Sequence, residues 1–85
     1  MSISARNDGT VEAVYILLKD DRAARTDEII EDILLADYNR RGELVGIEIL
    51  APVKIARITR LVDEPRRKYL RRFVQARAPQ ELVVA

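Results

Sequence analysis

The chain has 85 residues and a formal net charge of +1 at pH 7, and it contains neither cysteine nor histidine. A domain of this size buries a modest fraction of its surface, so a single core gives marginal stability and association with a second copy is expected. The missing residue types exclude disulfides, thiolate metal sites, thiol chemistry and any catalysis that needs a histidine base from this chain.

The net charge conceals a division along the chain. Residues 1–50 carry 6 basic and 11 acidic side chains, a net charge of −5, whereas residues 51–85 carry 9 basic and 3 acidic side chains, a net charge of +6. This asymmetry indicates either a polyanionic partner for the basic part or mutual neutralisation of the two parts. No apolar run approaches the roughly 18 residues of a membrane span, and the polar start lacks the apolar core of a signal peptide. We therefore expect a cytoplasmic protein without a membrane partner.

The first half of the chain predicts two strands after a flexible start. Residues 1–10 are polar, with a turn signal at positions 7–9, and we expect them to be flexible. Residues 11–18 contain a continuous apolar run, which is typical of a strand covered on both faces. Residues 23–29 predict a second strand. A helix beginning at Thr26 is the alternative, because a capping residue there precedes apolar positions at helical spacing.

A β-hairpin formed by residues 33–38 and 44–50 is the sharpest structural signal in the sequence. Gly42 accepts the left-handed conformation that such a loop requires, and Asn39 tolerates it. Alternation along the second strand predicts one set of side chains in the core and another on the opposite face. The core set is Val45, Ile47 and Ile49, and the opposite set is Leu44, Gly46, Glu48 and Leu50. Gly46 indicates a bulge or the close approach of another segment, such as the C-terminal helix or a second subunit.

Residues 52–78 carry two predicted basic helices. Pro52 cannot continue a central strand and suits the first turn of a helix, so the sheet is expected to end at Ala51. Apolar residues then recur at near-helical spacing as far as Val62.

Asp63 is expected to cap the second helix, which runs to about Arg77, with residues 64 and 65 in its first turn. The apolar stripe of this helix is Tyr69, Leu70, Phe73 and Val74. The tail, residues 79–85, is expected either to add an edge strand or to fray.

Four segments of the first half form an ordered pattern. They are Ala-x-Tyr-Ile around Tyr15, a threonine shortly before glutamate at Thr26, Asp-Tyr at Asp37, and Gly-x-Leu-Val-Gly-Ile-Glu-Ile over residues 42–49. Over about residues 11 to 50 this set resembles the small prokaryotic family called domain of unknown function 2283. The resemblance implies a compact antiparallel sheet with helical material, without an established enzymatic activity or agreed catalytic residues. Some members look like antitoxin-type partners of small toxin-like proteins.

The chain departs from that family pattern at residues 31–32, where a turn containing glycine is usual, and at residues 51–53. The basic extension after Pro52 is not covered by the resemblance.

Two acidic groupings are candidate sites. The first is Asp27, Glu28, Glu31 and Asp32, whose oxygens suit a hard cation. No loop spacing supports a cation there, and a solvated turn or pairing with the basic helices is the favoured interpretation. The second is Asp37 with Glu48 on neighbouring hairpin strands, where facing carboxylates could serve acid–base chemistry. Without a pocket or a histidine, we instead expect Glu48 to pair with Arg25 or with an arginine of the basic part.

The second predicted helix holds the only feature with a nameable ligand class. Its cations are Arg66, Arg67, Lys68, Arg71 and Arg72. Helical spacing places Arg67 and Arg71 on one line and Lys68 and Arg72 on the next, a spread that suits non-specific contact with phosphates. The same helix is equally a docking surface for the sheet or for a second subunit, with its cations keeping it soluble.

Taken together, these features predict a single α+β domain. A β-meander of about four antiparallel strands over residues 11–51 is followed by two helices whose apolar stripes cover one face of the sheet. The preferred function is a non-catalytic interaction module, a homodimer without cofactors that binds a protein partner in the antitoxin style. The alternative is non-specific nucleic-acid binding through the basic helix. A small enzyme is disfavoured because no motif announces a pocket for carboxylate or lysine chemistry.

Overall fold

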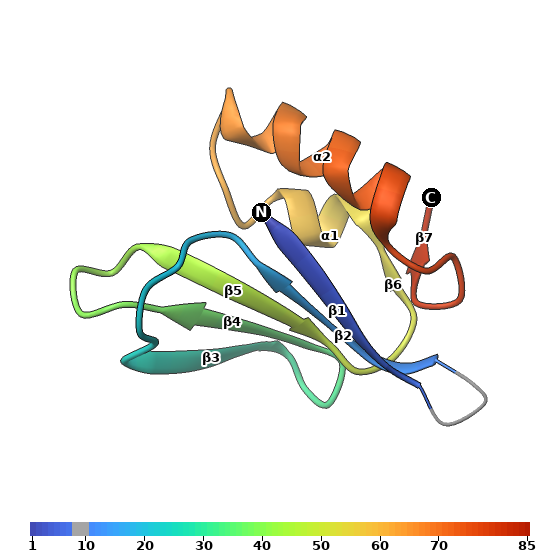
Figure 1. The fold of residues 1–85 in the computed structure, drawn as a ribbon, viewed down its shortest axis with the longest axis horizontal. Helices are drawn as coiled ribbons and strands as arrows, with labels where there is room; N and C mark the ends of the chain where they lie inside the picture. Colours follow the sequence, from blue (N-terminus) through green and yellow to red (C-terminus); the bar gives the residue numbers. More distant parts are fainter. Residues whose placement is uncertain (8–10) are drawn as a thin grey trace.

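The structure, a computed structural model, describes residues 1–7 and 11–85, which form a five-stranded antiparallel sheet with two helices on one side (Figure 1). The strands of the sheet are β1 (Ser2–Asn7), β2 (Val11–Leu17), β3 (Arg25–Ile30), β4 (Leu34–Tyr38) and β5 (Leu44–Ile49). The helices are α1 (Ile55–Thr59) and α2 (Arg66–Arg77), and the short strands β6 (Val53–Lys54) and β7 (Val83–Val84) form a separate parallel pair. The expected α+β class is confirmed.

The strand order in the sheet is β1-β2-β5-β4-β3. Strands β3, β4 and β5 follow one another as a meander, but β2 lies beside β5 and not beside β3, so the meander expected over residues 11–51 is wrong. β2 has a neighbouring strand on each edge, β1 and β5, but the helices lie over only one of its faces (Figure 1), so the cover expected on both faces is wrong. The more polar β3 takes the edge, where charged side chains are tolerated.

The N-terminal segment is a strand, so the flexibility expected for residues 1–10 is wrong for Ser2–Asn7. β1 pairs antiparallel with β2, and Ile3 lies opposite Ile16 and packs against the core. The alternation of serine with apolar residues at positions 2–5 suits an edge strand with one buried face. Of the expected turn at positions 7–9, the last two residues lie outside the described part of the chain. The sheet therefore has five strands where about four were expected.

A bulge in β5 corrects the expected alternation. Asp37 pairs with Gly46, but the next residue, Tyr38, pairs with Leu44, so Val45 is an extra residue in β5. The carbonyl of Val45 accepts hydrogen bonds from the backbone of Leu18 (2.9 Å) and Lys19 (3.2 Å).

The bulge moves Leu44 into the hydrophobic cluster, although it was expected on the opposite face, whereas Val45 is buried outside that cluster. Ile47 and Ile49 lie in the core as predicted, and Gly42 has the predicted positive φ (81°).

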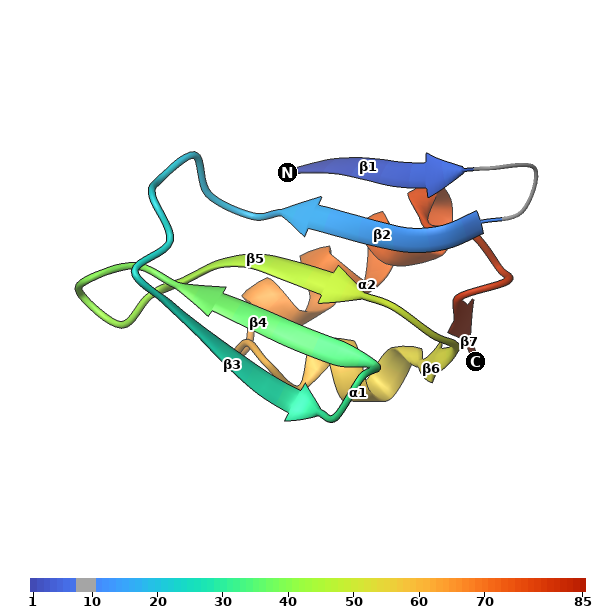
Figure 2. The same ribbon diagram turned by 90° about the horizontal axis from the view of Figure 1, so that it is seen from below.

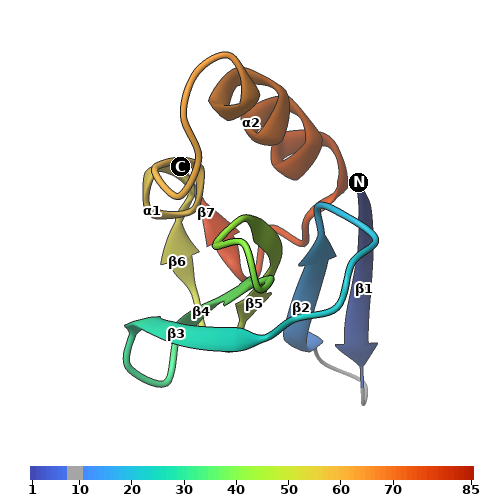
Figure 3. The same cartoon turned by 90° about the vertical axis from the view of Figure 1, so that its left-hand side faces the viewer.

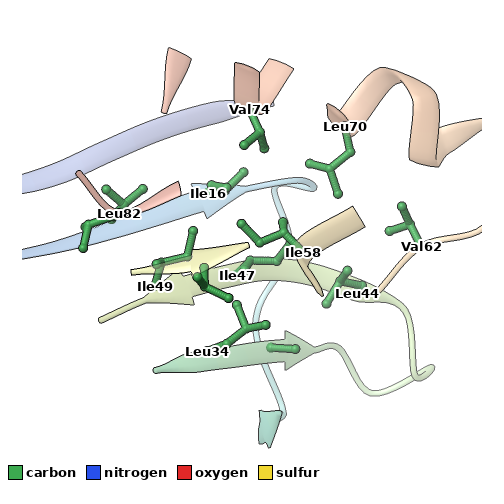
Figure 4. Packing of buried hydrophobic residues seen from close by; sticks show 13 residues of the cluster. Ile16, Leu34, Leu44, Ile47, Ile49, Ile58, Val62, Leu70, Val74 and Leu82 are labelled. Carbon is green, nitrogen blue, oxygen red and sulfur yellow. The ribbon is translucent and has the colours of Figure 1, made fainter. Parts of the chain in front are cut away.

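The core lies between the sheet and the helices, which occupy the same side of the sheet (Figure 3). Across β2, β5 and β4, the register aligns two rows of aliphatic side chains, Val14, Ile49 and Leu34 in one and Ile16, Ile47 and Ala36 in the other. All six are 0–1% exposed. Leu70 and Val74 extend from α2 toward them, and Ile58 of α1 joins the same cluster (Figure 4). Full burial of such a side chain stabilises the fold by about 1.5–3 kcal/mol.

The start of the first helix differs from the prediction. Residues 53–54 pair in parallel with residues 83–84, and the backbone of Val53 donates to the carbonyl of Leu82 at 2.9 Å. Because this pairing holds Val53 extended, the helix begins at Ile55 and not at Pro52. Leu82 is buried, and the residues after it form the edge strand β7. The edge strand was one of the two expectations for the tail, and the alternative, fraying, is wrong.

The second helix also begins later than expected. Pro65 is its N-cap, and the expected capping by the Asp63 side chain is wrong. The carbonyl of Asp63 instead accepts a hydrogen bond from the backbone of Arg67 at 2.9 Å. The predicted end at Arg77 is confirmed. Neither helix in the described part of the chain is long and apolar enough to cross a membrane.

Candidate functional site

The sheet face turned away from the helices is open in the isolated chain (Figure 2). The strand register arranges its side chains in two rows across β2, β5, β4 and β3. The first row is Leu17, Gly46, Asp37 and Thr26, and the second is Tyr15, Glu48, Leu35 and Glu28. Polar and acidic residues thus occupy the centre of a face that has no helix over it.

Tyr15, Asp37 and Thr26 form a hydrogen-bonded group on this face. The Tyr15 hydroxyl donates to Asp37 Oδ2 at 2.8 Å, and Thr26 Oγ1 donates to Asp37 Oδ1 at 2.6 Å. These short bonds to a carboxylate are of the stronger, charge-assisted kind. Three strands therefore meet at one carboxylate, which has a hydrogen bond on each oxygen.

Gly46 makes the reach of Tyr15 possible. Tyr15 lies on β2 and Asp37 on β4, so β5 lies between them, and neighbouring strands are about 4.8 Å apart. A Cβ atom built on Gly46 would overlap the hydroxyl and ring of Tyr15. The close approach expected at Gly46 is confirmed, but the approaching group is a tyrosine of the same sheet and not the C-terminal helix.

Glu48 lies beside this group on the open face. It is half-buried on β5, directly between Tyr15 and Leu35 in register, and none of the described side chains forms an ion pair with it. The expected pairing with Arg25 is wrong, since the Arg25 side chain bonds to Asp27 at 3.0 Å and lies over the Tyr38 ring at 4.6 Å. Asp37 and Glu48 share a face but are not opposite one another, because Asp37 lies opposite Gly46.

The setting of Tyr15 raises its pKa to about 12. Burial is the largest cause, and the hydrogen bond to Asp37 and the negative charges of Asp37 and Glu48 act in the same direction. The phenol is therefore neutral at physiological pH and acts as a hydrogen-bond donor.

A second polar network fixes the hairpin loop at the end of the sheet. Asn39 is 5% exposed, and its Nδ2 donates to Asp21 (2.9 Å) and Glu43 (3.0 Å) while its Oδ1 accepts from the backbone of Arg41 and Glu43. The bond from Asn39, together with Lys19, lowers the pKa of Glu43 to about 2. The pKa of Asp21 is also lowered, chiefly by its bond from Asn39. These contacts tie the loop to the β2–β3 connection and leave Asn39 no free bonding capacity for a ligand.

The predicted basic residues separate into two groups. The guanidinium of Arg67 turns inward, and its Nε donates to the carbonyls of Thr59 (3.2 Å) and Val62 (3.1 Å) behind α1. Arg67 thus stabilises the end of α1, where a cation is favoured. The other four cations are exposed on α2, namely Arg66, Lys68, Arg71 and Arg72.

The predicted neutralisation of the two parts of the chain is not found among the described side chains. Their four ion pairs all lie within residues 19–43, and none includes a residue of 51–85. The basic part therefore has a surface of unpaired cations as far as the structure describes the chain.

The first acidic grouping shapes a turn. A Glu28 carboxylate oxygen accepts from the backbone of Asp32 at 2.9 Å, and Asp32 has a positive φ of 61°. Within residues 1–7 and 11–85, no three acidic side chains come together in a way that could hold a metal ion.

Sequence reasoning named Asp37, Gly46 and Glu48 but missed that Tyr15 and Thr26 join them. The available signal was the pattern itself, since all five belong to the four segments that carry the family resemblance. Placing them together required the β2–β5 pairing, which the expected meander lacked.

The fold and the site define a class of small α+β proteins in which one face of an antiparallel sheet is packed by C-terminal helices and the other carries a tyrosine–carboxylate group. A comparison with models of protein families matches residues 8–51 to the family described as "Protein of unknown function (DUF2283)". The match spans just over half of the chain, and the chain belongs to this family. Neither the curated proteins nor the solved structures gave a match. The matched residues include the whole group on the open face, namely Tyr15, Thr26, Asp37, Gly46 and Glu48. Helix α2 lies outside the match.

Proposed function

We propose that this protein is a non-catalytic interaction module that binds a protein partner through the open face of its sheet, in the manner of an antitoxin that docks on its toxin. The carrying observation is that Tyr15, Thr26, Asp37, Gly46 and Glu48 come from four separate segments of the family pattern and converge on the face that the helices leave uncovered. An antiparallel sheet needs only one buried face for stability, so a built polar group on the other face suits recognition.

The chemistry of the group supports binding over catalysis. Both oxygens of Asp37 already accept hydrogen bonds, so it is poorly placed to take a proton from a substrate. The Tyr15 phenol is protonated at physiological pH, and its raised pKa of about 12 makes activation to a nucleophilic phenolate harder still. The chain supplies no histidine or cysteine to compensate.

The partner that this face suits carries cations among apolar side chains. The charged side chains described on the face are the carboxylates of Glu28, Asp37 and Glu48, and the half-buried Leu17 and Leu35 lie in the same two rows. An arginine of the partner placed over Glu48 would meet a carboxylate that has no ion pair among the described side chains, and planar bidentate pairing favours arginine there.

Site-specific photo-crosslinking in cells that contain the natural partners tests this proposal. A crosslinking residue at Leu35 is expected to give a discrete adduct that is lost in the Glu48→Arg variant and retained in the matched Glu31→Arg variant, which alters an exposed carboxylate of the β3–β4 turn. A crosslinking residue at Gln75, on the outer side of α2, serves as the positional control. Absence of an adduct at position 35, or equal adducts at both positions, would contradict the proposal.

We also propose that the protein forms a homodimer, which the small size of the domain supports. Light scattering of the purified protein measures this state directly. An adduct of twice the chain mass in the crosslinking experiment would identify a second copy, and not another protein, as the occupant of the open face.

The second candidate function is non-specific nucleic-acid binding through α2. The specific observation in its favour is the set of exposed cations on α2 that have no ion pair among the described side chains. Phosphate contacts release counterions, so the affinity must fall steeply as salt rises. Fluorescence anisotropy with a labelled oligonucleotide at several salt concentrations tests this candidate, with Arg22→Gln as the control for an exposed cation outside α2. Affinity that is independent of salt, or no binding at low salt, would exclude it.

A further inference from the structure

Tyr69 is an exposed aromatic residue in the middle of the basic helix. Its exposed fraction is 58%, the largest among the big apolar side chains of the described residues. It was expected in the core stripe of α2, but only Leu70 and Val74 of that stripe are buried. More than half of this side chain is therefore open to a ligand, in the middle of a helix whose other exposed side chains include four cations.

The helix places cations on both sides of this ring. Arg66 and Arg72 lie three residues before and three residues after Tyr69, which makes all three neighbours along one side of α2. Lys68 is the adjacent residue and is also exposed. One turn further on, the Arg77 guanidinium lies 5.9 Å from the centre of the Phe73 ring. Phe73 packs against the core, so Tyr69 is the exposed ring of α2, with cations three residues away in both directions.

A concave surface adjoins the same ring. Tyr69 and Arg66 line a cleft of about 250 Å³ between α2 and the end of the sheet. Its apolar walls include Leu18, Leu44 and Leu70. The cleft gives a flat, apolar group space beside the tyrosine ring, with the exposed Arg66 at its edge.

We propose that this surface binds single-stranded nucleic acid, with one base stacked on Tyr69 and the adjacent phosphates on Arg66, Lys68 and Arg72. The inference deepens the second candidate function and rests on it. Single-strand binding proteins combine a basic track with exposed aromatic rings, because every base has a face that can stack. In a duplex those faces are already stacked on neighbouring base pairs, so Tyr69 would contribute nothing to duplex binding.

Anisotropy titrations with four labelled oligomers of equal length test this inference. They are single-stranded RNA, single-stranded DNA, an abasic strand and duplex DNA. The wild-type protein is expected to bind the two base-containing single strands about 5- to 150-fold more tightly than the abasic strand, which is the gain for one stacked base. Its affinity for the duplex is expected to be the same in the wild type and in Tyr69→Ala. Comparing the affinities for single-stranded RNA and single-stranded DNA shows which of the two the protein prefers.

Variants separate stacking from charge. Tyr69→Ala is expected to lose the preference for strands with bases and to bind the abasic strand as the wild type does, while Tyr69→Phe retains the preference because it keeps the ring. Leu50→Ala, at another exposed apolar residue, is the matched control and is expected to change nothing. Arg72→Gln is expected to weaken binding to every oligomer and to reduce the slope of log affinity against log salt by about 0.7 for a single strand. Circular dichroism checks that each variant is folded.

Two results would overturn the inference. One leaves the second candidate function in place, and the other excludes that function too. Equal wild-type affinity for the abasic and base-containing strands, unchanged in Tyr69→Ala, would leave nucleic-acid binding in place and remove the stacking role of Tyr69. No binding of any oligomer at low salt would remove both the inference and the candidate function on which it rests.

Discussion

The two faces of the sheet are made by alternating residues of the same strands, yet they have different compositions and different coverings. Toward the helices, β2, β5 and β4 align two rows of aliphatic side chains that are 0–1% exposed. Away from the helices, the same strands present a tyrosine, two carboxylates and a glycine. Because the side-chain period of a strand is two, adjacent residues can serve stability on one face and recognition on the other. Substitutions at neighbouring positions should therefore have different consequences.

The largest expected effect tests this division on one strand. Leu34→Ala removes a side chain that is fully buried under the helices and should lower the free energy of unfolding by about 2–5 kcal/mol. Leu35→Ala, at the next residue and on the open face, should lower it by about 1 kcal/mol or less, because that side chain is only half-buried. Urea denaturation followed by circular dichroism measures both. Equal losses would mean that the open face is covered in solution.

The next effect tests the open face itself. Gly46→Ala places a methyl group where the Tyr15 ring lies and should lower the free energy of unfolding by about 1–3 kcal/mol. In a Tyr15→Ala background the same change should have little effect, because the ring is gone. A double-mutant cycle measures this coupling. Additive losses in the cycle would show that Gly46 serves the backbone and not the tyrosine.

Strand positions were largely predictable from the sequence, whereas strand order was not. The hairpin of residues 33–50 and its glycine turn are local features, so alternation and turn chemistry suffice to locate them. A bulge was one of the two expectations for Gly46, but nothing in the pattern of apolar residues shows that its neighbour Val45 is the extra residue. The pairing of β2 with β5 joins distant residues, and only tertiary packing decides it.

The candidate site was predictable in part of its membership but not in its arrangement. Asp37, Gly46 and Glu48 stood out as a polar set within a hairpin. Tyr15 looked like part of a buried apolar strand, and only its position beside β5 reveals that its hydroxyl reaches Asp37. Conversely, Arg67 was assigned to the phosphate surface because helical spacing cannot show that its guanidinium bonds to carbonyls behind α1.

A smaller effect concerns the Tyr15 hydroxyl. Tyr15→Phe removes one hydrogen bond and should lower the free energy of unfolding by about 0.5–1.5 kcal/mol. The tyrosine pKa is raised from 10.0 to about 12 by folding, so the folded state holds its proton more tightly than the unfolded state. The stabilisation that follows from the raised Tyr15 pKa is complete below pH 10 and is lost as the pH rises toward 12.

The pH dependence of urea denaturation, compared with the near-ultraviolet absorbance of tyrosinate, measures the alkaline effect. The wild type should lose stability across this range, and Tyr15→Phe should lose less. Identical alkaline profiles for the two proteins would place the effect elsewhere.

The smallest effect lies at the end of the sheet, outside both faces. Folding lowers the pKa of Glu43 from 4.5 to about 2, because the unprotonated carboxylate accepts from Asn39 and Lys19. The stabilisation of the fold by the ionised Glu43 is therefore complete above pH 4.5 and is lost as the pH falls toward 2. Carbon-detected NMR titration should show the Glu43 carboxylate titrating with a pKa of about 2, well below its ordinary value of 4.5. A Glu43 titration at the ordinary value would argue against the loop network.

The hydrogen bond from Tyr15 to Asp37 joins two parts of the sheet that are distant in the sequence. One part is the β1–β2 hairpin and the other is the β3–β4–β5 meander, and only the β2–β5 pairing brings the two residues together. A ligand that recognises both side chains would bind only fully folded copies. At one hundred times its Kd, such a ligand would add about 2.7 kcal/mol to the free energy of unfolding. For a domain of marginal stability, occupancy of the open face would then set the lifetime of each copy against cellular proteases.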